Sequence, residues 1–144
     1  MPPGKPLGKP PAEPNWLTVE TVVEFNREIV AAGGEPHELR DLAALEAAIR
    51  HAWNVWVYFM DRDFAVLAAR HFTSIAAARA FTDGNKRTAY RAALAFLDAN
   101  GLVIALGDNR RPVDQLLEFF SGRLSNRGVV EWFRLWMEPK PAQG

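Results

Sequence analysis

The residues best suited to chemistry lie in one short segment, residues 78–89, which reads ARAFTDGNKRTA. Gly84 allows the backbone to turn where a helix begins, and the free N–H groups of a first helical turn attract an anion. Asn85 supplies hydrogen-bond donors, Lys86 a point charge, and Arg87 a planar fork that suits phosphate oxygens. These residue types at this spacing predict a phosphate-binding turn.

Asp83 directly precedes this cationic cluster. A carboxylate there repels a phosphate unless a divalent cation lies between them, and Mg²⁺ is commonly held by one carboxylate together with substrate phosphates. Asp83 is therefore the candidate metal ligand of an Mg²⁺-nucleotide site. An alternative that the residues leave open is a solvated helix start, in which Asp83 caps the helix and the basic side chains face water.

The elements that must position this segment are predicted to be helices, so the expected fold class is all-α. Apolar residues recur at helical spacing in six stretches, and Asn26 lies on the first apolar stripe, where we expect it to be hydrogen-bonded. The run NVWVYFM, residues 54–60, fits a short strand, a flap or a continued helix. The predicted helix starts lie near Thr18, Asp41, Asp61 or Asp63, Gly84, Pro112 and Val129.

Composition narrows the classes of protein further. The 144 residues include 17 basic and 17 acidic side chains, so no overall positive field attracts nucleic acid or an anionic membrane. The absence of cysteine excludes thiol catalysis and cysteine-ligated zinc. No segment has the apolar length of a signal peptide or membrane span, so a cytoplasmic location is expected.

The ends of the chain differ from its middle. Residues 1–15 are rich in proline and predict a disordered tail, because such a segment buries little apolar surface. Residues 16–138 are expected to form one domain, followed by a flexible C-terminal tail over residues 139–144.

The segment AFTDGNKRTA, residues 80–89, resembles the signature of the Fic/Doc family, which is written H-x-F-x-[DN]-[AG]-N-K-R in its Doc (death-on-curing) branch. Upstream, GGEPHELRDLAALEAAIRHA, residues 33–52, is similar to a Doc segment in which a Gly-Gly helix end leads to a leucine-rich helix. The resemblance covers about residues 17–105 and implies a Fic-type bundle of about six helices, with a short flap between the second and third. The matching positions are Phe81, Asp83, Gly84, Asn85, Lys86 and Arg87.

The resemblance implies a role for each matching residue. Asp83 would bind Mg²⁺, Gly84 and Asn85 would form the anion-binding turn, and Arg87 would clamp phosphate. Lys86 stands where AMP-transferring Fic members have glycine, which implies the Doc branch and transfer of the γ-phosphate of ATP. The resemblance also implies a flap that docks the target. This flap would include Val55, Trp56, Val57 and Tyr58.

The departure from the pattern is Arg79, which occupies the place of the family's catalytic histidine. An arginine has no acceptor lone pair and stays protonated, so it cannot take the proton of a target hydroxyl. His37, His51 and His71 lie elsewhere in the sequence and offer no obvious replacement. Arg79 is either natural, in a degenerate member, or a substitution that disarms a toxin, and the otherwise complete motif favours the second.

The function implied by the resemblance is the toxin of a toxin-antitoxin pair. It would be an ATP- and Mg²⁺-dependent protein kinase that phosphorylates elongation factor Tu and inhibits translation, with its activity impaired by Arg79. Its partner would be a Phd-like antitoxin whose tail folds as a helix on the toxin. The alternatives are a Fic-type AMP transferase and a non-catalytic module that binds nucleotide or antitoxin.

Overall fold

The computed structural model describes residues 12–59 and 62–142, and in this part of the chain it contains six α-helices and one two-stranded sheet. The predicted all-α class is confirmed. The predicted tails fall mostly on residues 1–11 and 143–144, which lie outside the described residues, and there they stay predictions. Their inner bounds are wrong, because Asn15 is hydrogen-bonded to Asn100 and Pro139 pairs with Leu102 in the sheet. The elements are α1 (Val19–Ala32), α2 (Leu42–Phe59), α3 (Phe64–Ala78), α4 (Asn85–Ala99), β1 (Leu102–Ile104), α5 (Arg111–Leu117), the 3₁₀ helix η1 (Glu118–Ser121), α6 (Asn126–Trp136) and β2 (Met137–Pro139).

The helix starts follow from local capping. Thr18, Asp41 and Asp63 each accept a hydrogen bond from a backbone N–H of the turn that follows, which satisfies a donor that has no partner within the helix. The alternative cap at Asp61 lies outside the described residues. At the other end of α1, the N–H of Gly33 bonds back to the last turn, and the helix ends there as the Gly33-Gly34 pair predicts.

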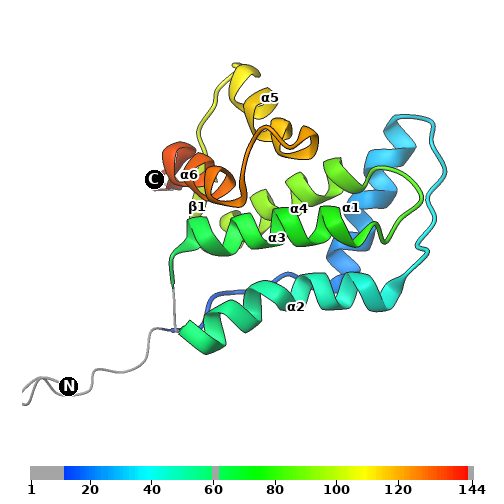
Figure 1. Cartoon of the computed structure of the whole chain (residues 1–144), viewed down its shortest axis with the longest axis horizontal. Coiled ribbons are helices and arrows are strands. Elements are labelled where there is room, and N and C mark those ends of the chain that lie inside the picture. The colour runs from blue at the N-terminus through cyan, green and yellow to red at the C-terminus, as the bar shows by residue number, and fades with distance from the viewer. Residues whose placement is uncertain (1–11, 60–61, 143–144) are drawn as a thin grey trace, which may run out of the picture.

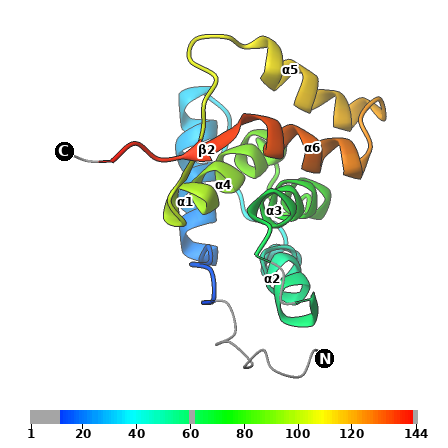
Figure 2. The ribbon, with the colours of Figure 1, turned by 90° about the vertical axis from the view of Figure 1, so that its left-hand side faces the viewer.

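Helix α3 is the centre of the molecule (Figures 1 and 2). It packs against α2 on one side, α4 on another, and α6 on the side opposite α2, while α1 packs across α4. The core is rich in phenylalanine, alanine and leucine, and the small alanines bring the helices close. Its largest buried side chains are Phe72, Phe81, Phe96, Phe133, Leu45 and Leu67.

The flap conformation expected from the resemblance is wrong, and the continued helix that the residues also allowed is confirmed as far as Phe59, whereas a target-docking role of these residues stays a prediction. Val55, Trp56, Val57 and Tyr58 lie within α2, which continues to Phe59. The run continues the helix because Val55 and Trp56 extend the inward stripe that starts with buried Leu45, and no glycine or proline interrupts it. The 18-residue helix is about 27 Å long and starts beside the motif, so these four residues lie at its far end.

The small sheet is not predicted by the pattern of the sequence. β1 follows α4 directly and pairs antiparallel with β2, which follows α6, with Val103 opposite Glu138. Each strand has only three residues, too few for an alternating pattern to be recognised. The pairing fixes the end of α6 beside the end of α4.

Candidate functional site

The motif forms the loop between α3 and α4, and two of its residues have left-handed backbone conformations. Gly84 has φ 76°, and a Cβ there would lie 3.0 Å from Cγ1 of Val30 and 3.2 Å from Nδ2 of Asn26. Arg79 has φ 46° and ψ 44°, the one positive φ of a non-glycine residue among those described. Glycine is thus required at 84 by both conformation and space, and Arg79 has an uncommon backbone for its type.

The loop is held by backbone hydrogen bonds to the segment that leads into α2. The carbonyl oxygen of Ala80 accepts from the N–H groups of Arg40 (2.7 Å) and Asp41 (3.1 Å), and the N–H of Thr82 donates to the carbonyl oxygen of Glu38 (3.0 Å). The hydroxyl of Thr82 also donates to the Glu38 carboxylate at 2.7 Å. The loop is therefore fixed before any ligand binds.

Asn85 has a structural role that the sequence analysis did not include. Its Oδ1 accepts from the N–H of Phe81 at 3.0 Å, and its Nδ2 donates to the carbonyl oxygen of Phe81 at 2.7 Å. Both ends of the amide thus hold the backbone of one residue. Phe81 is buried, as expected of an anchor, so Asn85 closes the loop around it.

The first turn of α4 is open to a ligand. Its N-cap is Gly84, and no side chain makes a capping hydrogen bond there. Asp83 is therefore not a cap, so this part of the solvated-start alternative is wrong, whereas Lys86 and Arg87 are exposed as that alternative expects. The N–H groups of this turn and the positive end of the helix dipole face outward for an anion.

The motif lines a cleft of about 650 Å³, within the usual size range of small-molecule sites. One wall is cationic and comes from the motif and from Arg40 before α2. The other wall is apolar and comes from α3 and η1, with Phe119 and Phe120 packed on Phe72 of the core. The lining residues are Arg40, Thr73, Ala76, Ala77, Arg79, Phe81, Thr82, Asp83, Gly84, Asn85, Lys86, Arg87, Phe119 and Phe120.

The charges of the cleft favour a polyanion. Four basic side chains line it against the single carboxylate of Asp83. Lys86 places Nζ 5.1 Å from the ring centre of Phe120, a cation–π distance. Arg87 donates to Glu35 Oε1 at 2.7 Å, but both side chains are partly exposed, so a phosphate can compete for the guanidinium.

An Mg²⁺ ion fits this donor set only together with a ligand. Among the described residues there is no cluster of three or more His, Cys, Asp or Glu side chains that would hold a metal. Asp83 forms no ion pair in the described chain and lines the same cleft as the basic side chains. One carboxylate completed by phosphate oxygens and water is an arrangement that Mg²⁺ accepts.

None of the three histidines, all of which lie in the described chain, lines the cleft. His71 is fully buried against Phe96, and burial, with a smaller contribution from His51, lowers its pKa to about 3. His51 borders a separate hollow on α2. His37 lies beside Phe81 and is bonded to Asn26. The expectation that no histidine replaces the one missing at position 79 agrees with this geometry.

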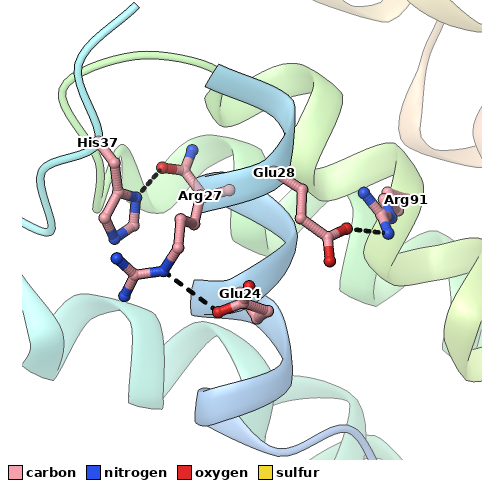
Figure 3. Close-up of polar contacts among 6 residues, drawn as sticks. Glu24, Arg27, Glu28, His37 and Arg91 are labelled. Atoms are coloured by element: carbon pink, nitrogen blue, oxygen red, sulfur yellow. Dashed lines mark hydrogen bonds and ion pairs between the residues drawn. The ribbon is translucent and has the colours of Figure 1, made fainter. Parts of the chain in front are cut away.

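A buried polar network lies behind the loop. Asn26 and Thr88 are fully buried, and Asn26 Nδ2 donates to the carbonyl oxygen of Asp83 at 2.8 Å and to Oγ1 of Thr88 at 3.1 Å. Its Oδ1 bonds to Nδ1 of His37 at 2.8 Å, on the side of α1 away from the Glu28–Arg91 pair (Figure 3). The hydrogen-bonded Asn26 expected from the apolar stripe is confirmed, whereas its partners could not be read from the sequence.

The chain belongs to the Fic/DOC family, whose model matches residues 16–97. The match covers α1 to α3, the motif loop and α4 as far as Leu97, and ends before α5 and α6. Members of this family are generally transferases and typically bind ATP with Mg²⁺. No curated protein matched the sequence. In the described part of the chain, no helix combines the length and apolar character needed to cross a membrane.

Proposed function

We propose that the cleft binds Mg²⁺-ATP and that the chain is a Doc-like protein kinase whose phosphate transfer is impaired by Arg79. The observation that carries the proposal is the meeting of Asp83 and the basic residues of the cleft at the uncapped start of α4. Asp83 would hold Mg²⁺, which would neutralise phosphate charge, and Lys86 and Arg87 would bind the phosphates.

The impairment follows from the chemistry of transfer. A target hydroxyl attacks the γ-phosphorus, the bond from that phosphorus to the bridging oxygen breaks, ADP leaves, and the hydroxyl proton passes to a base. Arg79 cannot accept that proton. General-base catalysis is typically worth about 10² to 10⁴ in rate, so binding is expected to survive while turnover is weak.

The first prediction is that Arg79→His restores transfer by at least about 10², the lower end of that range. Histidine also suits the left-handed backbone of position 79 better than arginine does, so the loop should keep its shape. The assay uses ATP labelled separately at the α- and γ-phosphates with elongation factor Tu as the target. Movement of the γ-label alone supports the kinase.

The other outcomes decide between the alternatives. Transfer of the α-label would replace the kinase by an AMP transferase, against the expectation from Lys86. Retained Mg²⁺-ATP binding with no transfer of either label in Arg79→His would support a non-catalytic binding module. That alternative is favoured by one observation, the absence of any histidine from the cleft lining.

We further propose that the biological role is that of a toxin held by a Phd-like antitoxin. The support is the family membership together with exposed apolar side chains at the end of α2, where Tyr58 is 81% and Phe59 74% exposed. Such a surface suits the apolar face of a helix that folds on binding. Inhibition of translation by phosphorylation of elongation factor Tu belongs to the same proposal.

A further inference from the structure

We propose that Asn26 and His37 are positioning residues that set the place of the Asp83 carboxylate in the cleft. This inference rests on the proposed Mg²⁺-nucleotide function. Neither residue lines the cleft, and both lie behind the motif loop, on α1 and in the segment that follows it. They act on the site through the backbone of Asp83.

The direction of the hydrogen bonds is fixed by the amide of Asn26. Its Oδ1 can only accept, so Nδ1 of His37 must carry a proton and donate to it at 2.8 Å. Its Nδ2 then has both of its hydrogens directed to acceptors, the Asp83 carbonyl oxygen at 2.8 Å and Thr88 Oγ1 at 3.1 Å. The carbonyl oxygen of Asp83, which can only accept, fixes the amide orientation, and His37 holds the amide there by donating to its Oδ1.

Burial makes this chain of bonds effective. Asn26 and Thr88 have no exposed surface, so water cannot replace a lost partner without opening the contact between α1 and α4. Gly84 lies against the same amide, because a Cβ at 84 would meet Nδ2 of Asn26 at 3.2 Å. A substitution of Asn26 therefore shifts the backbone of Asp83 and of Gly84 together, where the metal and phosphate would bind.

A second contact between α1 and α4, an ion pair, differs from the Asn26 hydrogen bonds in its effect on the loop. Glu28 and Arg91 form an ion pair between the same two helices (Figure 3). Arg91 also covers the ring of Phe25. Both charged side chains are substantially exposed, so the pair contributes little to stability. It joins the helices without touching the loop, whereas the Asn26 contact joins α1 to the loop itself.

The test begins without nucleotide. His37→Phe keeps an aromatic ring beside Phe81 but removes the donor, and His37→Asn restores a donor at nearly the position of Nδ1. We expect amide hydrogen exchange at Thr82 and Thr88 to be about fivefold faster in His37→Phe, the factor that corresponds to one net hydrogen bond, and near the original rate in His37→Asn. Equal rates in all three proteins would overturn the proposal.

The second arm titrates Mg²⁺ at constant ATP by calorimetry. We expect His37→Phe and Asn26→Ala to need about tenfold more Mg²⁺ for half-saturation, the lower end of the effects seen when a partner of a metal ligand is removed. Val22→Ala is the matched control, since it removes buried volume from the same helix away from the loop. An equal shift in Val22→Ala would show a merely structural role and overturn the proposal.

The two arms also separate this inference from the proposed function. If the unaltered chain binds no Mg²⁺-ATP, the proposed function fails, and the exchange rates still decide whether His37 and Asn26 hold the loop. If the unaltered chain binds Mg²⁺-ATP, and His37→Phe and Asn26→Ala match it in exchange rates and in Mg²⁺ requirement, the proposed function stands and the positioning role fails.

Discussion

At the scale of single residues, Arg79 combines an altered side-chain chemistry with a strained backbone. It ends α3 in the left-handed conformation at φ 46°, a position where glycine is the usual residue. A side chain with a Cβ costs roughly 1–2 kcal/mol in that conformation. The strained residue faces the cleft, so the strain lies where a ligand would bind.

The second prediction follows from this strain: Arg79→Gly should raise the free energy of unfolding by about 1 kcal/mol. The matched control is Arg70→Gly, an exposed change within α3, which should lower it by about 1 kcal/mol because glycine is a poor helix former. Urea unfolding measures both. A loss of stability in both variants would mean that the backbone at position 79 is not left-handed in solution.

The third prediction concerns His71. Both ring nitrogens are buried without a hydrogen-bond partner in the described chain, and burial lowers the pKa of the folded state to about 3, from the ordinary 6.5. Below pH 6.5 the unfolded chain binds a proton at His71 that the folded chain does not bind. Stability from this group should therefore fall as the pH drops from about 6.5 towards about 3, by about 1.4 kcal/mol per pH unit.

His71→Leu tests the origin of that slope. Leucine does not titrate and leaves no unpaired buried nitrogen. The free energy of unfolding of the variant should therefore decrease much less between pH 6.5 and pH 4.5 than that of the unaltered chain. Urea unfolding at several pH values gives the slope. Ile75→Val, a buried change on the same helix that carries no titratable group, is the control, and it should keep the slope.

At the scale of elements, capping residues were a better guide than apolar runs. Thr18, Asp41 and Asp63 predicted three helix starts, because a side-chain acceptor next to a free N–H is a local contact. The run at 54–60 left a strand, a flap and a continued helix open, because valine and aromatic residues suit strands and buried helices alike. The resemblance favoured the flap, whereas the described residues of the run, up to Phe59, are helical. β1 and β2 were missed because their pairing depends on residues far apart in the chain.

The fourth prediction distinguishes a helix from a flap at this run. Val57→Pro should lower the free energy of unfolding by about 3 kcal/mol, because proline removes a helical N–H and clashes with the preceding turn. Val57→Ala is the control and should cost far less, since Val57 is 36% exposed and alanine is a good helix former. Equal stability of the two variants would argue for a non-helical segment.

At the scale of the whole molecule, the candidate site is assembled from parts that the motif alone does not contain. The matched residues 16–97 supply Asp83, Arg87 and their support, whereas the aromatic wall comes from η1, beyond the match. Phe119 and Phe120 reach the cleft because α6 packs on α3 and because Trp132 Nε1 donates to the carbonyl oxygen of Pro112 at 2.6 Å. Spacing in the sequence does not reveal such a wall, since it requires the tertiary packing of three elements.

The fifth prediction concerns the proposed partner. A peptide from the tail of a Phd-like antitoxin should bind and become helical, so the circular dichroism of the mixture should exceed the sum of the parts. A variant with Tyr58→Ser and Phe59→Ser should show a smaller gain, because these side chains are exposed and apolar. No gain in helicity at saturating peptide would count against this partner.

The lining of the cleft has a spectroscopic consequence. All five tryptophans lie in the described chain, and none of them borders the cleft. Trp16 and Trp56 pack together, Trp132 packs on Phe133, and Trp53 is 39% exposed, so indole emission reports on parts of the molecule outside the cleft. The intensity of tryptophan fluorescence should change on denaturation and should change little when nucleotide is added. In Phe120→Trp, by contrast, an indole would line the cleft, and its fluorescence should change when nucleotide binds.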